Sequence, residues 1–279
     1  MKRQTSFAVS LLQTAALVGL LSAAGSVSSY AFDPRTIEEG QATPDEAFRF
    51  GAQAYKFGNK STAVQALTYA AHNGHMASQW KLGSMYEEGD GVAKDAGQAF
   101  DLFNGIVRQY GDAQPGSIEA RYVSNAIVKL SAFVRTGIKG KLAPNPKKAR
   151  DFLQYAASYF RDPDAQYHLA MSYLDKSDGK IEPKMAARWL NKAARKGHVA
   201  AQMKLGDLLL EGDVLPQQPV NGLKWLTVAR ILDSNNPQVL DRQEAAFALA
   251  DESTRQKAVE LANEWVNSGG EGDNESDGD

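Results

Sequence analysis

Apolar residues in the central part of the chain recur at helical spacing. Five segments start at a small residue, carry an aromatic or aliphatic residue three or four positions later, and carry a small or branched residue at the seventh position. This spacing places all three residues on one helix face. The segments begin at Ala63, Ala99, Ala149, Ala186 and Gly222. A second series of apolar–small pairs precedes them: Phe50-Gly51, Leu82-Gly83, Leu130-Ser131, Leu169-Ala170 and Leu205-Gly206. The two series predict pairs of helices that approach closely at the small residues.

The pairs repeat along the chain. Successive segments of the first series are 36, 50, 37 and 36 residues apart. Self-similarity with a period in the thirties is typical of stacked helical hairpins, in which each unit buries its apolar face against its neighbours. The pattern therefore predicts an all-α, right-handed helical-hairpin solenoid.

Residues between the predicted helices are typical of helix ends. Thr43, Asn145, Asp162 and Asn236 each precede a proline, and Thr43 is followed by Glu46 in capping-box spacing. Glu182 before Pro183 is a weaker start, because glutamate is a poor N-cap. Glycines that can adopt a left-handed conformation mark the helix ends and hairpin turns. They are Gly74, Gly89, Gly91, Gly137, Gly197 and Gly212.

The repeated segments resemble Sel1-like repeats, which are related to tetratricopeptide repeats. The resemblance extends over Ala77 to Asp95, and the openings Ala165 to Ala170 and Ala201 to Gly206 match as well. Arg188 to Gly197 is similar to the second helix of such a unit. We assign residues 45–235 to five units, of which the first and third are degenerate. Ser131 and Ala170 replace the usual glycine, and about 12 extra residues precede the third unit around Gln109 to Glu119.

The two ends of the chain differ from its centre. Residues 1–31 have the basic, apolar and small-residue regions of a secretory signal, which predicts cleavage before Phe32. Residues 32–44 form an N-terminal extension, and residues 236–268 are predicted to form helices that cap the last unit. Residues 269–279 hold five acidic residues and no apolar residue, so we expect a disordered acidic tail. The tail is either an interaction segment or simply a solvated end.

Charge and cysteine content narrow the functional classes. The net charge of −2 combines +2 from the signal with −5 from the tail, which leaves +1 for residues 32–268. Near-neutrality argues against nucleic acid as a partner, and no second apolar run reaches the length of a membrane span. The absence of cysteine excludes disulfides, thiolate catalysis and cysteine-ligated metals. Because of the signal at residues 1–31, we expect the mature protein to lie outside the cytoplasm after export by the Sec pathway.

No constellation of residues predicts an enzyme. His75 and His198 occupy equivalent positions after a glycine, which favours a turn role. His72 and His75 lack an evident third metal ligand, and the adjacent Glu87 and Glu88 do not face each other on a helix. The sequence therefore predicts no catalytic residue, no metal and no cofactor. Lysines and an arginine between Lys139 and Arg150 form a basic patch, either a solvated face or an anion or partner site.

Stacked hairpins expose a concave surface lined by the first helix of each unit, and such surfaces usually bind another protein. One column along this face carries Trp80, Tyr167 and Met203, large side chains suited to anchoring a partner. The complete predicted partner-binding set is Trp80, Ser84, Glu87, Tyr167, Met171, Met203 and Asp207. The alternative is that the aromatic column packs between repeats.

From its signal to its C-terminal helices, the chain resembles the alpha-proteobacterial exopolysaccharide-production repressors. The resemblance implies a periplasmic negative regulator that holds the sensor domain of a membrane histidine kinase inactive until a periplasmic protease removes it. A candidate proteolysis loop is the polar stretch Gly111, Asp112, Ala113, Gln114, Pro115 and Gly116. The alternative function is a periplasmic scaffold for envelope or polysaccharide assembly.

Overall fold

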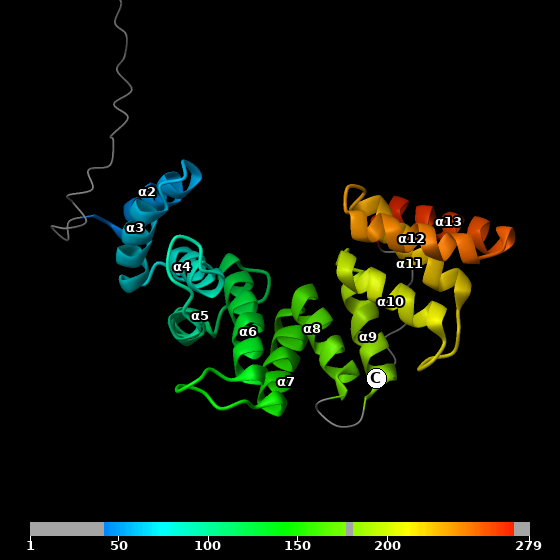
Figure 1. Ribbon diagram of the computed structural model, residues 1–279, viewed down its shortest axis with the longest axis horizontal. Coiled ribbons are helices and arrows are strands. Elements are labelled where there is room, and N and C mark those ends of the chain that lie inside the picture. The colour runs from blue at the N-terminus through cyan, green and yellow to red at the C-terminus, as the bar shows by residue number, and fades with distance from the viewer. Residues whose placement is uncertain (1–41, 177–180, 271–279) are drawn as a thin grey trace, which may run out of the picture. The chain divides into compact units, whose positions relative to one another are not determined.

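The computed structural model describes residues 42–176 and 181–270, and this part of the chain is an array of α-helical pairs (Figure 1). An isolated bridge between Ile138 and Leu142 is its sole β-type pairing. The predicted all-α helical-hairpin solenoid is confirmed. The five pairs are α2 (Pro44–Lys56) with α3 (Lys60–His72), α4 (Met76–Glu88) with α5 (Ala96–Tyr110), α6 (Ile118–Thr136) with α7 (Pro146–Tyr155), α8 (Pro163–Leu174) with α9 (Pro183–Ala194), and α10 (Val199–Glu211) with α11 (Pro219–Leu232). The predicted signal, most of the N-terminal extension and residues 271–279 of the tail lie outside the described residues.

Small residues lie where the two helices of a pair meet, as the sequence predicts. Gly51, Gly83, Ser131, Ala170 and Gly206 are all buried. The approach is closest in the last pair, where a Cβ on Gly206 would lie 2.9 Å from the carbonyl oxygen of Gly222. Packing at this distance leaves no space for a side chain, so the glycines determine how closely α10 and α11 pack.

The predicted helix ends are present. Thr43 forms the capping box with Glu46, while Asn145, Asp162 and Asn236 each accept a backbone N–H at the start of their helix. Glu182 makes no side-chain cap. The turn role of the two equivalent histidines is also confirmed. Nδ1 of His75 accepts the N–H of Ser78 at 3.2 Å, and Nδ1 of His198 accepts that of Ala201 at 3.0 Å.

Buried glutamine side chains join three of the units to the preceding unit. Nε2 of Gln79 donates to the carbonyl of Ala71, Gln166 donates to Ala157, and Gln202 donates to Ala194, at 3.0 to 3.3 Å. Each glutamine precedes the small residue of its first helix by four positions. At the remaining junction, between α5 and α6, the same position holds the buried Ile127.

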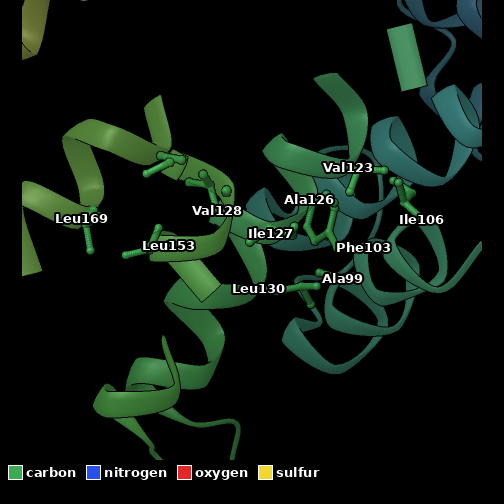
Figure 2. Close-up of a cluster of buried hydrophobic side chains, with 13 residues drawn as sticks. Ala99, Phe103, Ile106, Val123, Ala126, Ile127, Val128, Leu130, Leu153 and Leu169 are labelled. Atoms are coloured by element: carbon green, nitrogen blue, oxygen red, sulfur yellow. The ribbon is translucent and has the colours of Figure 1, made fainter. Parts of the chain in front are cut away.

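A buried cluster that we call the central buried cluster lies around this junction (Figure 2). Phe103 and Ile106 of α5 pack against Val123, Ile127 and Leu130 of α6, and the cluster continues through Leu153 of α7 to Leu169 of α8. The extra residues before the third unit lengthen its first helix: α6 has 19 residues, whereas α4 and α10 have 13 each. The remaining loop between α5 and α6 is short.

Two further helices, α12 (Pro237–Leu249) and α13 (Glu252–Asn267), follow the repeats and pack on α11 (orange to red in Figure 1). Trp265 of α13 meets Trp225 of α11 edge to face, with ring centroids 5.6 Å apart. Ala246 of α12 and Ala258 of α13 join Leu223 and Leu226 in one buried cluster. The apolar surface of the last repeat is thereby covered, which is the usual task of a terminal cap in a solenoid.

Candidate partner-binding surface

A groove of about 550 Å³ lies along the first helices of units two to four. We call it the first-helix groove. Its lining comes from the end of α4, one face of α6, the start of α7 and one face of α8. Glu87, Val128, Ala132, Arg135, His168 and Met171 are among the residues that line it. It combines apolar and charged groups over three repeats, so a protein segment is the kind of partner that fits it.

Ion pairs occupy the walls of the groove. Nζ of Lys129 lies 2.8 Å from the Glu87 carboxylate and joins α6 to α4, while Arg135 lies 3.2 Å from Asp175 and joins α6 to the end of α8. Both pairs are partly exposed, so each contributes little to stability. Charges of both signs therefore line the groove, an arrangement that favours specific binding over bulk electrostatic attraction.

A carboxylate between two histidines marks one end of the groove. Asp164 lies 3.4 Å from Nε2 of His198 and 3.7 Å from Nε2 of His168. The hydrogen bond from His198 is the main reason that the pKa of Asp164 is lowered, whereas burial lowers the pKa of His168. Because Nδ1 of His198 accepts the cap hydrogen bond, its proton sits on Nε2 and is directed to Asp164.

The structure brings two of the seven predicted partner-binding residues together. Glu87 and Met171 both line the first-helix groove, from α4 and α8. Trp80 instead lines a smaller groove of about 240 Å³ with Phe48, Tyr55 and Tyr122. Its ring packs against the central buried cluster, and its indole N–H is buried without a hydrogen-bond partner among the described residues.

The other four predicted residues have structural contacts. Ser84 is 7% exposed and its hydroxyl donates to the carbonyl of Trp80, which leaves little of the side chain for a partner. Tyr167 stacks on His198 with centroids 4.9 Å apart. Met203 packs against the buried cluster under the C-terminal helices, and Asp207 pairs with Arg242 of α12. The side chains on this part of the first-helix face are therefore engaged in contacts within the chain.

Sequence reasoning missed several groove residues, namely Lys129, Arg135, Asp164 and His168. Asp164, His168, Met171 and Asp175 follow one another at intervals of four, three and four residues, the spacing of a single helix face. Extending the predicted column from Met171 in both directions would have found the α8 members. Nothing in the sequence shows that Lys129 and Arg135 of α6 meet acids of other helices.

The candidate proteolysis loop connects α5 to α6. Asp112, Gln114, Pro115 and Gly116 are exposed, whereas Ala113 packs against the central cluster. Backbone hydrogen bonds close two turns in the loop, from Ala113 to Tyr110 and from Ser117 to Gln114. The loop is thus accessible but compact.

Within the described residues, no group of three or more histidine, aspartate or glutamate side chains is arranged to hold a metal ion. The same part of the chain contains no helix that is both long and apolar enough to cross a membrane.

Comparison with solved structures agrees with the observed fold. The chain is similar to c5321, a protective antigen of uropathogenic Escherichia coli with an SLR fold, at a TM-score of 0.64 and 23% identity. The match covers 84% of this chain and 48% of the antigen, so the chain spans about half of that protein. A Sel1 repeat protein from Oxalobacter formigenes matches 80% of this chain and 88% of its own length, at a TM-score of 0.59 and 21% identity. At these identities the likeness concerns the fold alone.

Sequence comparison gives the family. The Sel1 repeat family matches residues 77–104, 124–158, 163–198 and 199–230. An exopolysaccharide production negative regulator of Rhizobium meliloti strain 1021 is 34% identical over 253 residues, covering 88% of this chain and 92% of the relative. A protein of the same description from Rhizobium leguminosarum bv. viciae is 35% identical over 237 residues, covering 83% and 86%. The chain therefore belongs to the family of Sel1-repeat exopolysaccharide production negative regulators.

Proposed function

We propose that this chain is a periplasmic negative regulator that binds the sensor domain of a membrane histidine kinase and holds the kinase inactive. Exopolysaccharide synthesis then stays repressed until proteolysis removes the regulator. The similarity to exopolysaccharide production negative regulators over most of the chain carries this proposal. A Sel1 solenoid related to named regulators also points to a binding protein rather than an enzyme.

The first-helix groove is the surface we assign to the kinase. Met171 and Ala132 supply apolar contact area, and the pairs Glu87–Lys129 and Arg135–Asp175 supply charges of both signs around it. A regulator that binds one state of the kinase shifts the equilibrium only by its differential affinity for that state. Contacts spread over three repeats would depend on how the elements of the sensor domain are placed relative to one another. They would therefore distinguish the states of the kinase.

Removal of the regulator by a periplasmic protease would reverse the shift without any change to the kinase. The loop from Gly111 to Gly116 is the candidate site, because its polar residues are exposed between two helices. Cleavage there would separate α5 from α6, which share the central buried cluster. Mass spectrometry of fragments formed in the periplasm at acid pH tests this step; cuts confined to the helices would contradict it.

The proposal is tested by copurifying the chain without residues 1–31 with the periplasmic domain of the candidate kinase, and by measuring kinase autophosphorylation with and without it. We expect stable copurification and lower phosphorylation. Ala132→Arg places a bulky charge in the groove and should weaken binding at least tenfold. Ala245→Arg is the matched control, because Ala245 is an exposed helical alanine of α12 away from the groove.

The alternative is a scaffold for envelope or polysaccharide assembly, for which the extended helical surface is equally suitable. The scaffold predicts copurification with synthesis or secretion components and an unchanged phosphorylation state of the kinase after deletion of the chain. If Ala132→Arg and Ala245→Arg bind the kinase domain equally well, the groove assignment is wrong even where the regulator function holds.

A further inference from the structure

A second groove lies on a different face of the same helices. It measures about 500 Å³ and is lined by α5, α6, α7 and the turn before α7. We call it the second-helix groove. Its lining includes the apolar or aromatic side chains of Phe100, Val107, Ile127, Leu130, Phe152 and Tyr155. Ile127, Leu130 and Val134 of α6 line this groove, whereas Val128, Ser131 and Arg135 line the first-helix groove. The third unit thus separates two surfaces.

An exposed aromatic cluster extends this groove beyond the end of α7. One residue more than in units one and four separates Ala157 from the next helix cap, and the chain accommodates it in a π-helical turn at Ala156–Phe160. Tyr155 and Tyr159 stack with centroids 5.4 Å apart, and Phe160 meets both edge to face. The tyrosines remain 45% and 40% exposed. Single π-turns of this kind are frequent at functional sites.

Lysines border the apolar lining. Lys148 lines the groove with its ammonium 5.8 Å from the centre of the Phe152 ring, and Lys147 is exposed beside it. Neither forms an ion pair within the described residues, although Asp151 lies one turn further along α7. Lys141, on the turn before α7, already pairs with Asp101. The border therefore offers unpaired positive charge next to an apolar floor.

We propose that the second-helix groove binds an amphipathic acidic segment of a partner protein. Apolar side chains of the segment fill the groove and reach the Tyr155–Tyr159 cluster, while its carboxylates face Lys147 and Lys148. The lining favours a peptide over a saccharide, because it offers few polar groups to sugar hydroxyls and the side-chain oxygen of Asn145 already caps α7. The acidic tail of this chain lacks the apolar residues that the groove requires.

Peptide selection tests the proposal directly. A library of random 12-residue peptides displayed on phage is selected on the immobilised chain without residues 1–31. We expect enrichment of sequences that combine leucine or phenylalanine at helical spacing with aspartate or glutamate. The most enriched peptide is then labelled, and its affinity is measured by fluorescence anisotropy. Failure to enrich such sequences, or enrichment of basic ones, overturns the proposal.

Variants locate the binding. The double variant Lys147→Glu with Lys148→Glu should lower the affinity for the peptide at least tenfold. Tyr155→Ala with Tyr159→Ala should lower it by as much without loss of the helical circular dichroism signal. Lys56→Glu with Lys184→Glu is the matched control, since both lysines are exposed and distant in sequence from the groove. Equal binding by the control and the Lys147/Lys148 variant would disprove the site. So would preferential binding of an acidic oligosaccharide, or self-association of the chain that the tyrosine variant abolishes.

This inference is separable from the regulator function. The Lys147/Lys148 variant should still copurify with the kinase domain, whereas Ala132→Arg should still bind the selected peptide. Loss of kinase binding in the lysine variant would mean that the two grooves form one interface, and it would contradict a second partner.

Discussion

The junction between units four and five and the junction between units two and three are built differently. In the first, the buried amide of Gln202 donates to the carbonyl of Ala194, and His198 caps the new helix. In the second, Ile127 stands at the glutamine position, and the N-cap of the long α6 is Ser117 instead of a histidine. The junction between units four and five repeats the glutamine and histidine of the junction between units one and two. The junction between units two and three has neither.

The departures from the regular junction lie in the unit that lines both grooves. Both grooves are lined by α6 and α7, the helices of the third unit. In a regular unit the small residues, the helix cap and the glutamine make contacts between helices. These side chains are therefore used in packing the units together. In the third unit the lengthened α6 and the apolar junction leave faces that neighbouring repeats do not fill. The regular units thus use these residues for packing, and the third unit lines both grooves.

The largest effect should come from filling the closest regular contact. Gly206→Leu would force a side chain to within 2.9 Å of the Gly222 carbonyl and of Leu226, so the hairpin must separate. We expect a loss of about 3 kcal/mol in the free energy of unfolding, measured by urea titration with circular dichroism.

Ser131→Ala is the control at the equivalent position of the third unit. The Ser131 hydroxyl donates only to the carbonyl of Val128 in its own helix, so its loss should cost about 1 kcal/mol or less. A Gly206 variant as stable as this control would show that close approach at the glycine is unnecessary.

Substitutions at the equivalent positions of the two junctions, Ile127 and Gln202, should lower the free energy of unfolding by different amounts. Ile127→Gln places an amide among Phe103, Ile106 and Leu153 and should cost about 2 kcal/mol, since a buried unpaired amide is penalised. Gln202→Leu should cost about 1 kcal/mol or less, because the Ala194 carbonyl still accepts the N–H of Gly197 and an unpaired Oε1 is removed. Urea titration of both variants checks this. Equal costs would mean that the two junctions are equivalent.

The sequence predicts the regular part of this molecule well. Caps, turn glycines and small contact residues act within one hairpin, so their positions follow from local spacing. The repeated post-glycine position of His75 and His198 was enough to predict a turn role, and both histidines are helix caps.

The surface was much less predictable. Exposure on the first helices depends on how each unit sits against the next, which a single repeat does not encode. Trp80 and Met203 therefore pack against buried clusters, although helical spacing places them on the first-helix face. The π-turn after Tyr155 is visible in the sequence only as one additional residue between repeats. The ion pairs from α6 join residues about 40 positions apart and follow from the stacking alone.

The His75 cap should make the junction between units one and two sensitive to acid. Burial lowers the pKa of His75 in the folded chain, so the unfolded chain takes up the proton more readily. The stabilisation that neutral His75 gives the folded chain is complete above the pKa of about 6.5 that histidine has in the unfolded chain. It is lost as the pH falls toward the lower pKa of His75 in the folded chain. Protonation also removes the Nδ1 acceptor of the cap, a loss of about 1 kcal/mol at most.

His75→Asn keeps a cap that does not titrate. Unfolding free energies at pH 7 and pH 5 should therefore fall more for the native chain than for this variant. Parallel losses would show that another group controls the acid response. Ser117 and Asp162, which cap α6 and α8, have no corresponding histidine, so hydrogen exchange at those helix starts should change less over the same range.

The smallest effect, and the one with opposite sign, concerns Arg161. It has a φ of 54°, whereas Gly74 and Gly197 occupy the corresponding left-handed positions of the regular junctions. A non-glycine residue pays about 1 kcal/mol for this conformation. Arg161→Gly should therefore raise the free energy of unfolding by a few tenths to about 1 kcal/mol, reduced by the greater flexibility of glycine in the unfolded chain. Its backbone carbonyl still accepts the ammonium of Lys196, so that contact between units is retained. Gly197→Ala should destabilise by a similar amount. If Arg161→Gly is also destabilising, the arginine side chain contributes more to stability than its left-handed backbone conformation costs.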